Sequence, residues 1–81
     1  MEVQAAFDNH VRLKLESSFG KAVAMLILAT ASNAANAHMM GLDRDQYMRI
    51  CEAIARDQRV QDMWGASGAA DTLSQWKQLA S

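Results

Sequence analysis

The first third of the chain carries an apolar residue at almost every fourth position. These positions are Val3, Phe7, Val11, Leu15, Phe19, Ala22 and Leu26. A spacing of four is helical, but with 3.6 residues per turn it drifts around the helix by about 40° at each step. The drift predicts a helix over about residues 2–40 that either is surrounded by other protein or bends. Gly20 is the expected bend point, because glycine inside a helix costs about 1 kcal/mol relative to alanine. Two alternatives stay open: one long helix with a weak spot, or two helices that meet at residues 17–20.

A helix end and a new helix start are indicated just after residue 40. Gly41 is expected to end the first helix in the left-handed conformation that glycine adopts without strain. The residues that follow match a capping box and a hydrophobic staple, which are formed by Leu42, Asp43, Gln46 and Tyr47. A second helix is therefore predicted over about residues 44–64.

The predicted second helix separates an apolar face from a charged face. At 100° per residue, the apolar face holds Tyr47, Ile50, Cys51, Ala53, Ile54, Val60 and Trp64. The opposite face holds Asp45, Arg49, Glu52, Arg56 and Arg59. Asp45–Arg49 and Glu52–Arg56 are the ion pairs expected at a spacing of four residues. Asp57 falls inside the apolar arc, where it either reaches water at the rim or pairs with a base on a partner chain.

The C-terminal part predicts a third, short helix. Residues 65–68 contain two glycines and indicate a flexible break. A helix is predicted over about residues 70–79, with Leu73, Trp76 and Leu79 on one face. Ten residues are too few to stay helical alone in water, so this helix is expected to dock on the rest of the chain or on another protein. The predicted fold class is all-α, a small helical bundle.

Residues 22–42 contain no Asp, Glu, Lys or Arg. A secretory signal starts with positive residues at the N-terminus, whereas twenty residues with their own amphipathic pattern precede Lys21. A membrane span needs about 20 predominantly apolar residues, and only residues 22–28 are strongly apolar. The segment is therefore interpreted as a buried helix of a soluble protein, with no membrane contact.

Chain length and cysteine content predict that a second copy covers this helix. The 81 residues form one domain, 1–81, whose core is marginal for a monomer, and the single cysteine excludes an internal disulfide. A homodimeric bundle is the expected solution. Its predicted interface comprises Phe19, Val23, Leu26, Ile27, Thr30, Asn33, Ala34 and Ala37. Two interpretations of Asn33 and Asn36 stay open: they fix the register of the interface, or they face solvent.

The titratable and metal-binding residue types form no motif that indicates chemistry. His10 and His38 have no recognisable partner residues. Cys51 lies on the apolar face of the second helix and is expected to act as a small hydrophobe. Asp43 and Asp45 lack the glycine and the closing glutamate of a calcium loop. We predict no catalytic, cofactor-binding or metal-binding residues, and a function that is not enzymatic.

Residues 37–50 match the pattern of a helix-turn-helix motif, with Ala37 in the first helix and Gly41 in the turn. In this alternative, the residues that face a DNA groove are Arg44, Gln46, Met48 and Arg49. The net charge is −1, from eight basic and nine acidic side chains, and nucleic-acid-binding domains usually carry a basic excess. Binding to nucleic acid is therefore the disfavoured alternative.

Together these patterns predict a small cytoplasmic regulator or adaptor that forms a homodimer and binds a larger protein to modulate or inhibit it. One unpaired cysteine fits a reducing compartment. Contact with the larger protein is expected at Met48, Met63, Trp64 and Trp76, because aromatic residues and methionine are enriched in interface cores. A competing interpretation places both tryptophans in the core of the bundle.

Overall fold

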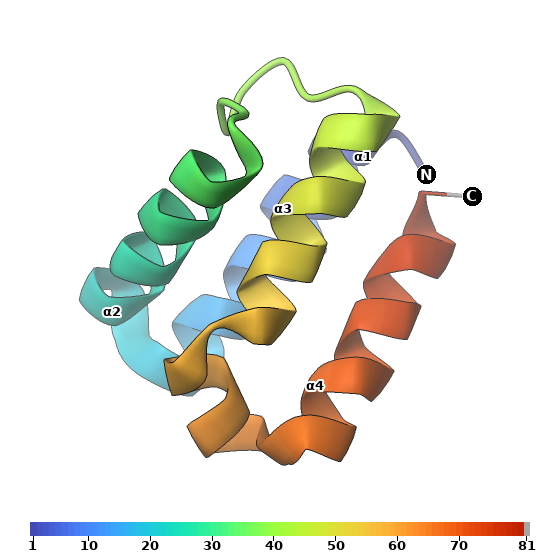
Figure 1. Cartoon of the computed structure of the whole chain (residues 1–81). Helices are drawn as coiled ribbons and strands as arrows, with labels where there is room; N and C mark the ends of the chain where they lie inside the picture. Colours follow the sequence, from blue (N-terminus) through green and yellow to red (C-terminus); the bar gives the residue numbers. More distant parts are fainter. Residues whose placement is uncertain (81) are drawn as a thin grey trace.

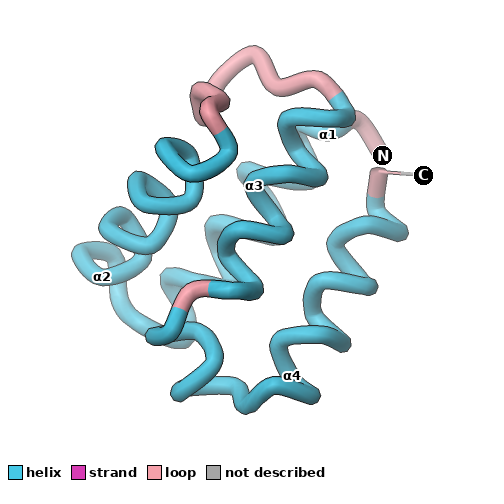
Figure 2. Tube along the Cα trace, in the orientation of Figure 1, coloured by secondary structure: helices cyan, strands magenta, loops and turns pink. Residues whose placement is uncertain are grey.

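The chain forms helices joined by one loop and one extended residue. This computed structural model describes residues 1–80, and every regular element among them is helical (Figures 1 and 2). The elements are α1 (Val3–Ala6), a π-helical turn (Phe7–Val11), α2 (Arg12–Ala35), α3 (Arg44–Arg56) and α4 (Gln58–Leu79). The first three follow one another without interruption and form a single helix, Val3–Ala35. The predicted all-α class is confirmed.

Gly20 bends this first helix. Its backbone angles, φ 80° and ψ 163°, belong to a region that essentially only glycine occupies. The chain turns back at this residue, so residues 3–19 and 21–35 form two arms that run in opposite directions (Figure 1). We call them the first arm and the second arm. Of the two alternatives that the sequence left open, the structure has two helical arms that meet at Gly20.

The second arm ends earlier than the sequence predicts. Asn36 caps it in the left-handed conformation, with φ 52°, and its amide donates to the carbonyl oxygen of Asn33. Gly41 also has a positive φ, 67°, but it lies in the loop before α3. The helix predicted to reach residue 40 therefore stops at Ala35, because asparagine tolerates the left-handed conformation that ends a helix.

The π-helical turn explains how a spacing of four residues can face one core. Phe7, Val11 and Leu15 are all fully buried, although this spacing drifts around an α-helix. A π-helical turn closes i to i+5 hydrogen bonds and so uses more residues per turn than an α-helix. The π-helical turn over Phe7–Val11 therefore turns the residues spaced by four back toward the core and offsets their rotation around the helix.

The predicted capping box starts α3. The Asp43 carboxylate accepts a hydrogen bond from the Gln46 amide at 2.8 Å, and Gln46 Oε1 accepts one from the Asp43 amide at 3.0 Å. The helix then stops at Arg56 instead of residue 64, because Asp57 has an extended backbone and caps α4. Its carboxylate accepts from the Arg59 amide at 2.8 Å and pairs with the Arg59 guanidinium at 2.7 Å. Asp57 is thus a helix cap, which neither interpretation of the sequence anticipated.

A second glycine bend divides α4. Gly65 has φ 75° and ψ 162°, nearly the same conformation as Gly20. It separates a short helix, residues 58–64, from a C-terminal arm, residues 66–79. The flexible break predicted over residues 65–68 is therefore a bend at one residue, and the third helix starts at 66 instead of 70.

The two arms of the first helix, α3 and the C-terminal arm of α4 form an up-and-down bundle. Helix α3 lies in the middle, between α2 and α4, with the first arm behind it (Figure 1). The short helix 58–64 closes one end of the bundle. The radius of gyration is 11.2 Å, close to the roughly 11.7 Å expected for a compact domain of this length. One chain therefore closes the bundle without a second copy.

The core draws large side chains from every arm. They include Phe7, Val11, Leu15, Ile27, Leu28, Tyr47, Ile50, Ile54, Val60 and Trp76. The Tyr47 hydroxyl donates to the backbone carbonyl of Trp76 at 2.6 Å. That carbonyl belongs to the last turn of α4, where backbone acceptors lack a partner within the helix, and the Ala80 amide binds Lys77 instead. Tyr47 thus joins the start of α3 to the end of α4.

Replacing Gly20 with alanine is expected to lower the free energy of unfolding by about 1–3 kcal/mol, because alanine is strained in this backbone conformation. No other atom lies within 4 Å of the added Cβ, so the strain comes from the backbone alone. Urea denaturation measures the change. Ser17→Ala, at an exposed helical position of the first arm, is the control and should stay within about 0.5 kcal/mol of the wild type. Equal stability of the two variants would contradict the bend.

Candidate functional site

The second arm has one buried and one exposed face. Ala24, Ile27, Leu28, Ala31 and Ala35 face the core. The opposite side, which we call the uncharged face, carries exposed or half-buried residues: Ala22, Met25, Leu26, Ala29, Thr30 and Asn33. Met25 is 48% exposed and Leu26 is 57% exposed. One side of this segment is therefore buried in its own chain, and the other side leaves apolar side chains exposed at the surface.

Two of the residues predicted to form a dimer interface are buried inside the single chain. Ile27 and Ala37 belong to the core, so they have no surface to offer a second copy, and the prediction is wrong for both. Phe19 and Val23 are half-buried and pack against the edge of the core. The cause is the bend at Gly20, which brings the first arm over one side of the second arm.

The other predicted interface residues are exposed. Leu26, Thr30 and Asn33 lie on the uncharged face, and Ala34 lies at its border with α3. Asn33 and Asn36 both face solvent in the single chain. The sequence prediction omitted Met25, although its spacing of four from Ala29 and eight from Asn33 places all three on one side of a helix.

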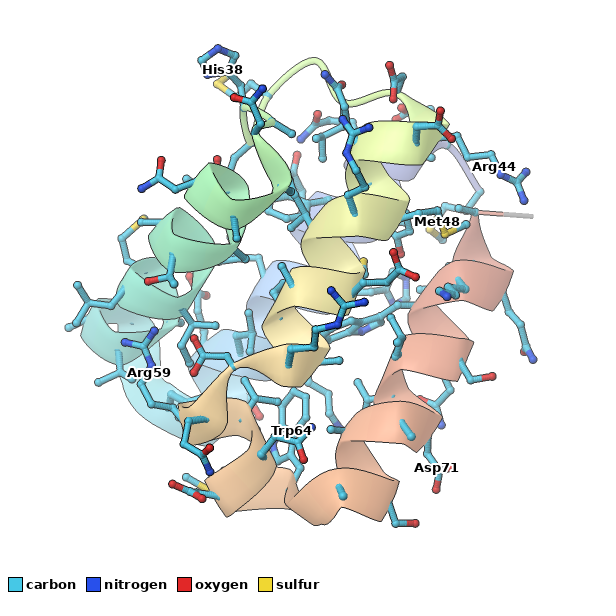
Figure 3. All side chains as sticks on the ribbon, viewed as in Figure 1. His38, Arg44, Met48, Arg59, Trp64 and Asp71 are labelled. Carbon is cyan, nitrogen blue, oxygen red and sulfur yellow. The ribbon has the colours of Figure 1, made fainter. Side chains whose placement is uncertain are left out.

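The two tryptophans close the core of the bundle. Trp76 is 3% exposed, so the prediction that it contacts a partner is wrong. Trp64 is half-buried at the foot of the bundle (Figure 3), and its ring centre lies 6.1 Å from that of Phe19 and 6.0 Å from that of Trp76. Its Nε1 donates to Ser18 Oγ at 3.1 Å, and Lys14 Nζ lies 5.1 Å from its ring centre. These contacts tie the short helix 58–64 to the first arm.

The two methionines predicted to contact a partner differ in exposure. Met48 is half-buried and packs against the core at the side of α3. Met63 is 54% exposed on the short helix 58–64. Of the four residues predicted to contact a larger protein, Met63 presents the most surface.

The geometry of a helix-turn-helix motif is absent from the described residues. Ala37 lies beyond the end of α2 and is buried, whereas the motif requires it in the first helix. The connection to α3 spans residues 36–43, longer than the turn of three to four residues that defines the motif. Gln46 is engaged in the capping box. Arg44 and Arg49 are exposed, and Arg44 extends away from the bundle (Figure 3).

A groove of about 290 Å³ runs between the second arm and α3. It is lined by Ala34, Ala35, Arg49, Glu52, Ala53 and Arg56. Glu52 Oε2 lies 3.1 Å from Lys77 Nζ of α4. The ion pairs predicted within α3, Asp45–Arg49 and Glu52–Arg56, are not formed, and neither arginine has an ion-pair partner among residues 1–80. The sequence prediction did not include Arg56 among functional residues, because a glutamate four residues earlier normally neutralises it.

A smaller pocket of about 130 Å³ lies at the C-terminal end of the second arm. Its lining consists of Ser32, Asn33, Asn36, Ala37 and His38. The Ser32 hydroxyl donates to the Ala37 carbonyl, and His38 stands on the loop at the top of the bundle (Figure 3). No carboxylate lines this pocket. Within residues 1–80, no group of three or more His, Cys, Asp or Glu side chains could hold a metal ion.

Cys51 is held as a neutral thiol in the core. Burial raises its pKa to about 12, although a hydrogen bond with Tyr47 opposes part of the shift. Burial also raises the pKa of Tyr47. At neutral pH the thiol is therefore protonated, and it lacks the thiolate character that nucleophiles and metal ligands require.

Comparison with protein-family models, with curated proteins and with solved structures finds no match to this chain.

One helix is long and apolar enough to cross a membrane, judged by length and composition. It is Val3–Ala35, whose apolar 18-residue stretch has a mean hydropathy of 1.2 and is 28% buried. The bend at Gly20 divides this helix into two arms, each shorter than the roughly 20 residues that a span requires. The core helix of a soluble protein passes the same test.

The free energy of unfolding is expected to fall as the pH rises from about 9 towards 12. The pKa of the Cys51 thiol is raised from its ordinary value of 9.0 to about 12 by folding, so over this interval the unfolded chain has released a proton that the folded chain keeps. The stabilisation is complete below the lower pKa and is lost as the pH approaches the upper one. Urea denaturation at about pH 8 and about pH 11 measures the slope.

Cys51→Ala is the control for this pH dependence. It should reduce the loss of stability between the two pH values, and the loss that persists reports Tyr47, whose raised pKa acts in the same direction. Identical losses in the wild type and in Cys51→Ala would contradict the assignment to Cys51.

Proposed function

We propose that the protein is a non-enzymatic interaction protein that forms a homodimer through the uncharged face and binds a larger protein, which it modulates or inhibits. The observation that supports this proposal is the exposure of Met25 and Leu26 on a helix face that carries no charge. Contiguous exposed apolar surface on a small protein commonly marks an interaction site. The buried, unpaired Cys51 supports action in the reducing cytoplasm.

A second copy of the chain fits the uncharged face. In a twofold dimer the same patch meets itself, and the residues of this face carry no charge that would repel its copy. The Arg59 guanidinium, which borders the face at Thr30, is neutralised by Asp57. Ala22 and Ala29 are small, so the backbones of two helices can approach closely. Asn33 lies near its own symmetry mate when the arms cross there, and paired amides fix the register of such an interface. The arm is about 22 Å long at 1.5 Å per residue, which limits the surface that two copies can bury along it.

The larger partner is proposed to contact the closed end of the bundle, where Met63 is exposed. Methionine has an unbranched, polarisable side chain that adapts to different partner surfaces. Trp64 supports this site from beneath, because its ring is fixed by Phe19, Trp76 and the hydrogen bond to Ser18.

Leu26→Glu is expected to convert the dimer into a monomer, because the interface would bring two carboxylates together across the symmetry axis in an apolar contact. Light scattering coupled to size-exclusion chromatography measures the mass at tens of micromolar protein. Leu13→Glu is the matched control: Leu13 is 52% exposed but lies on the first arm, and this variant should stay dimeric. A wild-type protein that is monomeric at this concentration would overturn the proposed dimer.

Met63→Glu is expected to abolish binding of the larger protein while leaving the dimer intact, because it places a charge in the proposed contact. Affinity capture from the organism of origin with wild type and variant, read by quantitative mass spectrometry, tests this. A protein enriched by the wild type and reduced at least tenfold by Met63→Glu supports the site. A partner captured equally by both, but lost with Leu26→Glu, would move the contact to the uncharged face.

A further inference from the structure

We infer that the groove between the second arm and α3 binds an acidic helical segment of the partner protein through Arg49 and Arg56. This inference rests on the proposed function, because it gives the chemistry of a segment of that partner. The segment carries two carboxylates about 10 Å apart, one for each guanidinium.

Three charged residues line the groove, Arg49, Arg56 and Glu52, and the Glu52 carboxylate is paired with Lys77 of α4. Glu52 stands between the two arginines, three residues after Arg49 and four before Arg56, where it would normally neutralise either. Lys77 draws its carboxylate toward α4, with Nζ 3.1 Å from Oε2. Asp45 is exposed and forms no ion pair with Arg49. The two guanidiniums therefore have no ion-pair partner among residues 1–80, and the one carboxylate that lines the groove is neutralised by Lys77.

The shape of the groove suits a helix. Half of its lining residues are alanines, Ala34, Ala35 and Ala53, whose small side chains let a backbone approach closely. Arg49 and Arg56 are seven residues apart on α3, which corresponds to about 10.5 Å along the helix axis. Acidic residues seven apart on a partner helix have the same spacing, and each carboxylate can accept two hydrogen bonds from a guanidinium.

Charge around the groove favours an acidic peptide over nucleic acid. Asp43 and Asp45 are exposed at the start of α3 outside the groove lining, where they would repel an extended phosphate backbone but not a short peptide confined to the groove. Arg59 reaches the second arm, where its Nη2 lies 3.3 Å from Thr30 Oγ1. It adds no net positive charge there, because it is paired with Asp57. Two arginines in a groove of about 290 Å³ match a short segment with two carboxylates better than an extended run of phosphates.

Binding of two model peptides tests this inference. Both are fluorescein-labelled, alanine-based helices; one carries glutamates seven residues apart and the other carries glutamines at those positions. Fluorescence anisotropy is expected to show that the glutamate peptide binds at least tenfold more tightly and that added salt weakens it. The double variant Arg49→Gln/Arg56→Gln should reduce its affinity at least tenfold. Arg44→Gln, which changes an exposed arginine of α3 outside the groove, should stay within twofold of the wild type.

Three results would overturn the inference: equal binding of the two peptides, unchanged binding by the double variant, or tighter binding of a short DNA duplex that also depends on both arginines. Circular dichroism checks that the variants keep the helical fold, which is expected because both arginines are exposed. Light scattering on the same samples separates this inference from the proposed dimer. A dimer that fails to bind the glutamate peptide overturns the groove alone, and a monomer that binds it overturns the dimer alone.

Discussion

The reversal of the chain at Gly20 is the constraint on which the rest of the structure depends. A straight helix over residues 3–35 would be about 50 Å long at 1.5 Å per residue, whereas the longest dimension of the molecule is 28 Å. Folding the helix back places residues of both arms, among them Phe7, Val11, Ile27 and Leu28, in one core within a single chain. The reversal takes place at one residue with a positive φ and an extended ψ, and that combination requires glycine.

Helix α3 occupies the space that the two bends create. Gly20 and Gly65 have nearly the same backbone conformation, and each folds a helix whose arms pack around α3. Two side chains of α3 bind α4: Tyr47 donates a hydrogen bond to its last turn in the core, and Glu52 pairs with Lys77 at the surface. The second interaction leaves Arg49 and Arg56 without a carboxylate. The pairing of Glu52 with a residue of α4 thus decides the net charge of the groove that Glu52 shares with the two arginines.

Features decided by neighbours in sequence could be predicted, and features decided by distant contacts could not. The capping box of Asp43 and Gln46 and the bend at Gly20 depend on a few adjacent residues, and both occur where the sequence places them. Asp57 was assigned to a continuous helix because the apolar spacing continues through it to Trp64. The spacing persists because the short helix 58–64 packs on the same core, although the backbone is extended at Asp57. The partner of Glu52 is 25 residues away, so no local pattern reveals it.

The order of the arms has a consequence for the folding rate. Helix α2 packs against α3, and α3 packs against α4, so most contacts between helices join elements that are adjacent in sequence. Contacts of the first arm close longer loops, as between Ser18 and Trp64 and between Gln4 and Leu42. Helical proteins with such low contact order fold within microseconds to milliseconds, because little chain entropy is lost before contacts form. At Gly20 and at Gly65 a single residue connects two helical arms. These neighbouring arms can therefore pack against each other with little loss of chain entropy.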